Sequence, residues 1–304
     1  MRKFSISFLI LLVLLFASCV SLRGRVLSAE DEAILYPVAS YVPESFDWQE
    51  IRIGGGAGAG ADMRVVPGVW TFDFENPDIP LIYHAVKIDL SGASGSGAAA
   101  GQGTRGGAGS EAGTGLTLAS SQWERTADFA ERQGCLVAMN ATPFDKTKLA
   151  GIYKLDGQLL SGPVARYAAL GLRCGAGGEV QGARIFASQT DGELAEYNAA
   201  FGGFFVVVEK GEVRTEYVRR YTARSGAGLS ADGKALYLLV VEGERPQKSI
   251  GLSYPQCGEI FRAMGCSDAL EFDGGGSSDL CINGRSVMSY KVRRVQGNSI
   301  GLKK

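Results

Sequence analysis

Hydrophobic positions recur mostly with the two-residue period of β-strands along this chain of 304 residues. The segment 81–90 (LIYHAVKIDL) alternates apolar and polar side chains, which predicts a half-buried strand. The pairs Lys210-Gly211 and Asp232-Gly233 predict hairpin turns. Further apolar runs predict strands at 136–139, 167–173, 183–187, 203–209, 235–242 and 269–272, with a last strand and turn at 281–284.

Two segments have the period of a helix instead. Apolar side chains recur at helical spacing in 121–133, and Gly134 marks the end of this segment. Five side chains fall on one helix face in 253–264, with Pro255 in the first turn and Gly265 after the last. Because helices and strands do not alternate regularly, the pattern predicts a mixed α+β fold, with a strand-rich central sheet and a few packing helices.

The N-terminus has the pattern of an export signal. Arg2 and Lys3 precede an unbroken apolar run at 8–16, which is shorter than the roughly 20 residues of a membrane span. The sequence 15–19 (LFASC) is similar to a bacterial lipobox, in which the signal is removed and the cysteine is acylated. We therefore expect a signal peptide at 1–19 and a lipoprotein anchored through Cys19, periplasmic or at the cell surface. A retained N-terminal anchor and plain secretion are the alternatives.

Two low-complexity segments divide the rest of the chain. Residues 54–61 are only glycine and alanine, and 91–115 hold almost nothing but small residues. Neither can bury enough apolar surface to offset the entropy of ordering, so both are expected to be mobile loops. The expected organisation is an N-terminal extension with a Gly/Ala loop at 20–80, followed by one domain at 81–304 with an insertion at 91–115.

Charge and cysteine content exclude several classes of protein. The formal net charge is −1, from 31 basic and 32 acidic residues, so no nucleic-acid partner is expected. Five cysteines besides Cys19 are an odd number, which argues against a disulfide scaffold. Cys257 and Cys266 are close enough along the chain to bridge, but flank a helix and are expected to be reduced. His84 is the single histidine, expected to be structural, and an ordinary zinc site is not expected.

The most informative motif is the glycine-rich loop that follows the strand ending near Glu271. Three consecutive glycines cost backbone entropy, but they let a ligand approach the chain and let successive N–H groups form an anion-binding nest. A tight turn capped by Asp273 is the structural alternative, and the absence of a following lysine excludes a Walker A loop. The candidate residues of this loop are Asp273, Gly274, Gly275, Gly276, Ser277 and Ser278.

The loop resembles the DGGGS signature of the phosphodiester glycosidase family, whose members include the uncovering enzyme that removes N-acetylglucosamine from mannose 6-phosphate tags. The segment 135–144 (CLVAMNATPF) is similar to the family's Asn-Gly-Gly-Phe-Phe strand end, with Asn140 and Phe144 matching. The segment 224–228 (RSGAG) resembles Arg-Thr-Ala-Ile-Gly, and 293–298 (RRVQGN) resembles the closing Glu-Arg-x-Val-x-Asn. The sequence departs from the family at 141–143, Ser225 and Arg293.

This resemblance implies hydrolysis of a sugar-1-phosphodiester, such as a GlcNAc phosphodiester, at the glycosidic carbon. Asp273 is then the first candidate for the reacting carboxylate and Glu271 the second, on one face of the strand by alternation. Arg224 and Arg294 would hold the phosphate, and Asn140 would orient sugar hydroxyls or a water. No cofactor is required, although Asp273 or Glu271 offers oxygen ligands for a divalent cation.

The sequence thus predicts an exported hydrolase that acts on a glycosyl phosphodiester or an envelope glycan. The alternative is a non-catalytic lipoprotein that binds a glycan or phosphate, because a fold does not fix a function.

Overall fold

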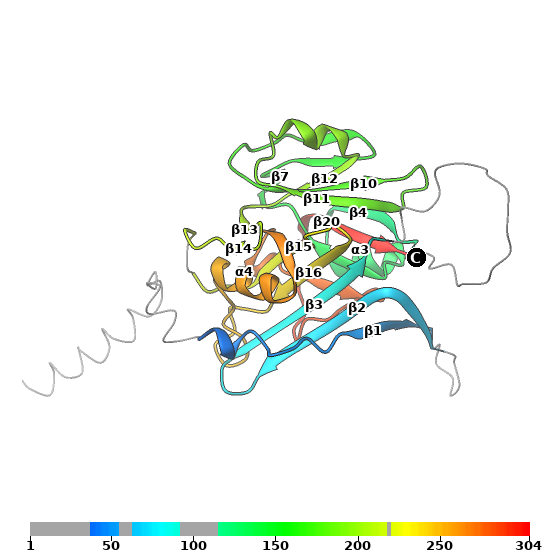
Figure 1. Ribbon diagram of the computed structural model, residues 1–304. Coiled ribbons are helices and arrows are strands. Elements are labelled where there is room, and N and C mark those ends of the chain that lie inside the picture. The colour runs from blue at the N-terminus through cyan, green and yellow to red at the C-terminus, as the bar shows by residue number, and fades with distance from the viewer. Residues whose placement is uncertain (1–36, 55–62, 92–114, 218–219) are drawn as a thin grey trace, which may run out of the picture.

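The computed structural model describes residues 37–54, 63–91, 115–217 and 220–304. This part of the chain forms three larger sheets, with two α-helices packed against them (Figure 1). The expected signal peptide and Cys19 lie outside the described residues, as do most of the two low-complexity segments. The predicted α+β class is confirmed.

The largest sheet has eight antiparallel strands. β2 and β3 pair from Val69↔Ile88 to Asn76↔Leu81, so residues 49–76, which the sequence placed in an N-terminal extension, supply strands to this sheet. In spatial order the strands are β1 (Gln49–Ile53), β2 (Arg64–Asn76), β3 (Leu81–Asp89), β16 (Ala235–Val241), β15 (Arg224–Ser230), β17 (Cys266–Glu271), β13 (Val206–Glu209) and β14 (Glu212–Val213).

Helix α4 (Tyr254–Ala263) covers one face of this sheet over β13, β14 and β17. Its Ile260 and Phe261 are fully buried with apolar side chains of the strands. The helix packs closely because β15 carries glycine opposite it. A Cβ at Gly226 would lie 2.6 Å from the carbonyl oxygen of Leu270 and 3.1 Å from the ring of Phe261.

A five-stranded sheet contributes to the other side of the core. Helix α3 (Thr126–Gln133) covers its outer face through the buried Phe129, and Gly134 ends the helix in the left-handed conformation with φ 63°. In spatial order the strands are β19 (Arg285–Ser286), β18 (Leu280–Ile282), β5 (Val137–Asn140), β20 (Gln296–Lys303) and β4 (Thr117–Glu124).

A second five-stranded sheet lies at the top of Figure 1. Its strands in spatial order are β11 (Val180–Phe186), β10 (Ala169–Cys174), β12 (Ala199–Gly202), β8 (Tyr153–Leu155) and β9 (Gln158–Ser161). The remaining elements are the hairpin β6 (Phe144–Asp145) and β7 (Lys148–Leu149) and the 3₁₀ turns η1 (Val38–Ser40), η3 (Gly192–Glu196) and η4 (Gly275–Ser277).

The three larger sheets share one apolar core. A single cluster of buried side chains includes Val240 and Leu270 of the eight-stranded sheet, Met139 and Ile300 of the sheet that contains β20, and Leu170 of β10. Segments that lie far apart in the sequence therefore meet where these sheets converge, and the candidate site is built from such segments.

Most local predictions agree with these elements, but two were wrong. The strand expected to be half-buried at 81–90 is β3, which is buried on both faces because it lies between β2 and β16 inside the eight-stranded sheet. One helix boundary also differs. Residues 121–124 are the end of β4 and pair with β20, so the helix expected from 121 begins only at Thr126. The expected hairpins are confirmed: Lys210-Gly211 joins β13 to β14, and Asp232-Gly233 joins β15 to β16. The five described cysteines form no disulfide with one another, in agreement with the reduced state expected for Cys257 and Cys266.

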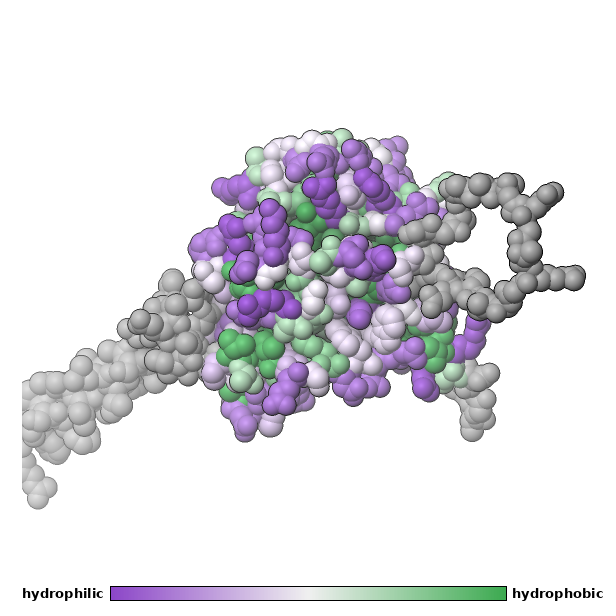
Figure 2. All heavy atoms as spheres, in the orientation of Figure 1, coloured by the Kyte–Doolittle hydropathy of each residue, from purple (hydrophilic) through white to green (hydrophobic). Residues whose placement is uncertain are grey.

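The described surface is mainly polar. Figure 2 shows charged and polar residues spread over one face of the molecule, with apolar residues in small separate groups. Within the described ranges, no helix is both long enough and apolar enough to cross a membrane.

Candidate active site

The glycine-rich loop lies where β5, β15 and the C-terminal segment meet. β17 ends at Glu271, and the backbone N–H of Asp273 then donates to the carbonyl of Ala141, which follows β5, at 2.9 Å. The loop also contacts the segment before β15, because the N–H of Gly275 donates to Ala223 at 2.8 Å. The structure thus brings together three of the four segments singled out in the sequence, and Arg294 supplies the fourth.

Asp273 is half-buried at the start of this loop. Burial raises the pKa of its carboxyl group to about 6, while a hydrogen bond from Ser277 and the charge of Arg294 act in the opposite direction. The exposed Arg294 guanidinium in turn donates through Nη1 to the Ser277 hydroxyl at 3.4 Å. The buried Ser277 therefore joins the half-buried Asp273 to the exposed Arg294.

Three N–H groups of the glycine-rich loop are engaged within the protein. The N–H groups of Gly275, Ser277 and Ser278 donate to the carbonyls of Ala223, Gly274 and Gly275 at 2.8, 3.3 and 3.1 Å. These donors hold η4 together and are not free to bind an anion. Two of the glycines also have a structural role, because a Cβ at Gly274 would lie 2.8 Å from the Ala223 carbonyl oxygen and Gly275 has a φ of 61°.

Asn140 ties this loop to two sheets. It is fully buried at the end of β5, and its Nδ2 donates to the Asp273 carbonyl at 2.7 Å. Its Oδ1 accepts from the Ser225 hydroxyl at 2.8 Å and from the Asp279 N–H at 3.0 Å. Both lone pairs of this oxygen are thereby used, so Asn140 positions the loop and has little capacity left for a sugar hydroxyl.

Glu271 and Arg224 lie in a separate environment below α4. Burial raises the pKa of Glu271 to about 8, and the Arg224 charge and the Cys257 thiol lower it only in part. Neither carboxylate oxygen has a hydrogen-bond partner of normal geometry among the described residues. Because β17 ends at Glu271, strand alternation does not extend to Asp273, and the two carboxyl groups have different neighbours.

Arg224 itself is 6% exposed. Its Nε donates to the Leu252 carbonyl at 3.0 Å and its Nη2 to the Arg220 carbonyl at 2.6 Å, while the guanidinium lies 3.8 Å from the ring centroid of Tyr254. These contacts hold the cation close to Glu271 but use part of its capacity to bind phosphate. Arg294 is the more accessible of the two predicted phosphate ligands.

Aromatic rings extend from Tyr254 along this side of the site. The Phe205 ring stacks on Tyr217 at 4.5 Å and meets Tyr254 edge-on at 5.7 Å. Tyr167 packs edge-on against Phe204 and Phe205 at 5.3 and 5.8 Å. The backbone fixes this group beside Glu271, since the N–H of Phe204 donates to the Glu271 carbonyl.

Comparison with known proteins assigns this arrangement to a family. The sequence model of the phosphodiester glycosidase family matches residues 133–303, which include Asn140, Arg224, the glycine-rich loop and Arg294. The chain belongs to the phosphodiester glycosidase family. No curated protein matches the sequence.

Solved structures share the fold of this family member at low identity. The catalytic domain of zebrafish N-acetylglucosamine-1-phosphodiester alpha-N-acetylglucosaminidase, auto-inhibited by its pro-peptide, is 16% identical with a TM-score of 0.56, over 84% of this chain and 88% of that chain. A hypothetical protein from Synechocystis is 12% identical with a TM-score of 0.57, over 84% of this chain and 68% of that one. These likenesses concern the fold alone.

One carboxylate beside the loop was missed in the sequence. Glu244 follows β16, is exposed and has a φ of 61°, which is uncommon for a residue other than glycine. Its Oε1 accepts from the Thr222 hydroxyl at 2.8 Å and would lie 3.3 Å from a Cβ at Gly275. In the sequence, the available signal for Glu244 was its position after a strand end and a glycine in 241–244. Only the folded chain places Glu244 over the glycine-rich loop.

A second missed carboxylate, Asp279, is fully buried directly after the loop. Burial raises the pKa of its carboxyl group to about 6, against the effect of a 2.6 Å hydrogen bond from Ser286 and the charge of Arg125. Its position next to Ser278 was the only signal in the sequence. Its backbone N–H is one of the groups that Asn140 holds.

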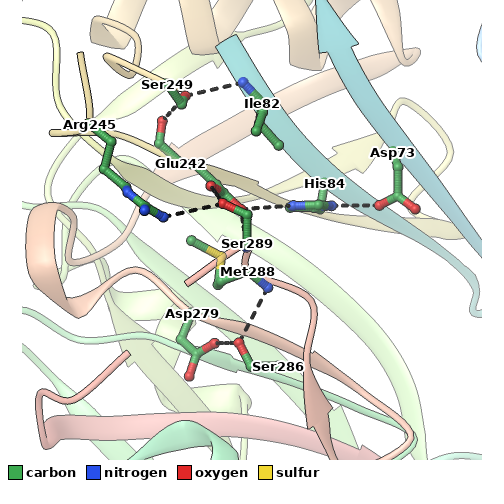
Figure 3. A network of polar contacts seen from close by, with 10 residues as sticks. All are labelled: Asp73, Ile82, His84, Glu242, Arg245, Ser249, Asp279, Ser286, Met288 and Ser289. Atoms are coloured by element: carbon green, nitrogen blue, oxygen red, sulfur yellow. Dashed lines mark hydrogen bonds and ion pairs between the residues drawn. The ribbon is translucent and has the colours of Figure 1, made fainter. Parts of the chain in front are cut away.

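His84, expected to be structural, lies in a polar network that runs from the exposed Asp73 to the buried Glu242 (Figure 3). Its Nδ1 is 2.6 Å from Asp73 and its Nε2 is 3.3 Å from Glu242. Burial alone would lower the pKa of His84, but these two carboxylates raise it to about 9, so the ring is charged at neutral pH. Glu242 also accepts from the N–H of Ser289 at 2.5 Å, which ties β16 to the C-terminal segment.

Metal binding was left open by the sequence. Among the described residues, no group of three or more His, Cys, Asp or Glu side chains converges as metal ligands would. The arrangement of Asp273 and Arg294 is suited to acid and base chemistry beside an accessible cation.

Proposed function

We propose that this protein hydrolyses the glycosidic bond of a sugar-1-phosphodiester, of the GlcNAc-phosphodiester type. The observation that carries this proposal is the contact of Asp273 with Arg294 through Ser277 in a member of this family. It places a carboxyl group with a pKa of about 6 beside a guanidinium that is accessible to phosphate. The name of the zebrafish relative, which acts on such a phosphodiester, agrees with this substrate class.

In the proposed reaction Arg294 holds a phosphate oxygen and Asp273 acts on the sugar. Ionised Asp273 takes a proton from water while the water oxygen bonds to the anomeric carbon, and the carbon–oxygen bond to the phosphate breaks. The electron pair leaves with the phosphate, which is a good leaving group and needs little acid assistance. Glu271 is neutral at pH 7, because its pKa is about 8. In this proposal Glu271 and Arg224 have a supporting structural role next to the reacting groups.

The second candidate is a glycan- or phosphate-binding lipoprotein without turnover. The observation in its favour is that Asn140 and Arg224, both expected to contact substrate, are engaged in hydrogen bonds within the protein. Such a protein would bind the same diesters but leave them intact.

An assay of the purified full-length chain in detergent separates the two. We expect release of free sugar from UDP-GlcNAc or related sugar phosphodiesters. The variant Asp273→Asn should lose roughly 100-fold or more of kcat/KM, and Arg224→Ala should be strongly impaired. Asp156→Asn, an exposed aspartate in a turn elsewhere, is the matched control and should retain full activity. Tight binding of every diester without hydrolysis, with or without added divalent metal, would establish the second candidate instead.

We also propose that the protein is exported and held at the membrane by acylated Cys19. The pattern at residues 1–19 supports this proposal. The site then faces the periplasm or the cell exterior, where envelope glycans are available as substrates.

A further inference from the structure

Glu244 is an exposed carboxylate beside the glycine-rich loop, and the reaction proposed above gives it no role. Its backbone has a φ of 61°, in the left-handed region that residues other than glycine seldom adopt. Such a conformation costs free energy and persists where the surroundings hold it, often at functional sites. The segments around Glu244 hold it in this way.

Three stretches of backbone pack closely at this point. A Cβ at Gly243 would overlap the backbone nitrogen of Ala223, so a glycine is required directly before Glu244. The Ala223 carbonyl in turn accepts from the N–H of Gly275 at 2.8 Å. The Thr222 hydroxyl donates to Glu244 Oε1 at 2.8 Å. The backbone and this hydrogen bond therefore fix the carboxylate over the loop.

The Glu244 carboxylate and the Arg294 guanidinium lie beside neighbouring glycines of the loop. A Cβ at Gly275 would lie 3.3 Å from Glu244 Oε1, and a Cβ at Gly276 would lie 3.9 Å from Arg294 Nη1. Among the described residues, neither Glu244 nor Arg294 takes part in an ion pair. A negative and a positive group, each without a charged partner in the described chain, thus flank Gly275 and Gly276.

The arginine that follows Glu244 in the chain has other partners. Arg245 donates through Nη1 to the Ser289 hydroxyl at 3.5 Å (Figure 3). Its guanidinium lies 4.9 Å from the ring centroid of Tyr290. Its backbone closes a turn with Ser249 through two hydrogen bonds of 2.9 and 2.8 Å. These contacts engage Arg245 without pairing it with the Glu244 carboxylate.

The charge of Glu244 affects which substrates the site favours. A phosphodiester carries one negative charge, which Arg294 attracts and Glu244 repels. A cation on the substrate beside the phosphate replaces this repulsion by an attraction. An ammonium group suits a carboxylate, because it donates up to three hydrogen bonds and a charge-assisted bond is stronger than a neutral one.

We propose that Glu244 binds an ammonium group on the substituent at the far side of the substrate phosphate. The proposal rests on the proposed function, because Arg294 is taken to hold the phosphate and Asp273 to face the bond that breaks. The substrate class is a zwitterionic glycosyl phosphodiester, in which a short chain joins the phosphate to a primary amine. Glu244 is then a residue that determines specificity and takes no part in the chemical step.

Two other partners fit Glu244 less well than an ammonium group. A divalent cation prefers several oxygen ligands, and among the described residues no group of three His, Cys, Asp or Glu side chains converges. A neutral hydroxyl donates to the carboxylate, but it leaves the repulsion between carboxylate and phosphate in place.

The test compares two diesters of GlcNAc-1-phosphate that match in length and differ in charge, the 2-aminoethyl and the 2-hydroxyethyl compound. For the wild type we expect a KM about tenfold lower for the aminoethyl diester. Glu244→Gln keeps an acceptor for Thr222 but removes the charge, so the two KM values should become equal. Glu50→Gln, which alters an exposed glutamate on the edge strand β1, is the matched control and should keep the wild-type preference.

A second variant guards against misfolding. Glu244→Asn should fold, because asparagine tolerates a positive φ, and it should lose the same preference. Equal KM values for the two diesters in wild type would overturn the proposal. A fall of kcat on both diesters in folded Glu244→Gln would also overturn it, because Glu244 would then act in the chemical step. Added Mg²⁺ that lowers the hydroxyethyl KM to the aminoethyl value, in wild type alone, would overturn it in favour of a bridging metal ion.

Calorimetric binding keeps this test separate from the proposed function. The full-length Asp273→Asn protein, with and without Glu244→Gln, is titrated with both diesters in the presence of EDTA. About tenfold weaker binding of the aminoethyl diester alone on loss of the Glu244 charge supports the proposal even where the wild type hydrolyses nothing. Equal binding of the two diesters to the Asp273→Asn protein overturns it even where hydrolysis is observed.

Discussion

Two carboxyl groups flank Phe272, and burial raises the pKa of each to a different extent. Asp273 keeps contact with water and with Arg294, so its pKa reaches about 6. Glu271 is enclosed by α4 and β15, so its pKa reaches about 8 in spite of Arg224. At pH 7 the first is mostly ionised and the second mostly protonated, which is the division of states that acid–base catalysis uses.

The ionisation of Asp273 predicts the acid limb of the activity profile. Because Asp273 must be ionised to accept a proton, kcat/KM should rise with pH through about 6. Arg294→Ala removes a charge that favours the ionised form of Asp273, so the acid limb of the kcat/KM profile should move to higher pH. In addition, kcat/KM at pH 8 should fall roughly tenfold or more, because the variant has lost a phosphate-binding group.

The neighbouring Arg293→Ala is the control, since Arg293 is also an exposed arginine and directly precedes Arg294 in the chain. Its removal should leave the acid limb where it is in wild type. An identical acid limb in Arg294→Ala and wild type would contradict the role assigned to Asp273.

Glu271 predicts a pH-dependent stability. Its pKa is about 8 in the folded protein, above the ordinary value of 4.5, so its favourable contribution is complete below 4.5 and is lost as pH rises toward 8. The loss amounts to about 1.4 kcal/mol per pH unit in that window. Glu271→Gln should therefore flatten the fall in unfolding free energy between pH 5 and 8, measured by urea denaturation.

Glu212→Gln changes an exposed glutamate and should leave the pH dependence as in wild type. A Glu271→Gln curve parallel to that of wild type would show that Glu271 ionises normally in the fold.

At the scale of elements, local pattern was sufficient where local contacts decide the structure. The strand at 81–89, the hairpin turns at Lys210 and Asp232, and the helix face of α4 were all predictable from neighbouring residues. The burial of β3 on both faces was not, because it depends on the strands and helix that pack around it. The error at 121–125 has a long-range cause. Trp123 follows a helical spacing, but β20 pairs with this segment from more than 170 residues away and holds it as a strand.

The candidate site shows the same limit. The glycine-rich loop and Asp273 could be found from the sequence, because the motif is contiguous. The use of the loop N–H groups, the engagement of Asn140 with Ser225, and the approach of Glu244 depend on contacts between distant segments. No local pattern carries that information.

The packing of α4 on β15 gives a prediction at this scale. Gly226→Ala should lower the unfolding free energy by about 1–3 kcal/mol, because the added methyl group meets the Leu270 carbonyl and Phe261 at closer than ordinary contact. Gly182→Ala in β11 is the matched control, since its added methyl group would meet no described atom within 4 Å. Equal urea midpoints for the two variants would contradict the close packing of helix and strand.

At the scale of the whole molecule, the proposed lipid anchor determines where the enzyme acts. Cys19→Ser removes the proposed acylation site and leaves the sequence of the described domain unchanged. We expect the variant to move from the detergent phase to the aqueous phase in phase partitioning, with kcat/KM on a soluble diester unchanged. The wild-type protein in the aqueous phase would indicate plain secretion, and a variant that stays in the detergent phase would indicate a retained N-terminal segment.

The position of β20 also constrains how the protein is made. Residues 296–303 are the central partner of both β4 and β5, and they supply Ile300 and Leu302 to the shared core. The ribosome must release nearly the whole described chain before β20 can pair with β4 and β5. This sheet therefore remains incomplete for most of the synthesis, and the nascent chain is open during that time. An open chain is the form that a translocation channel can thread, so this topology is compatible with the export proposed above.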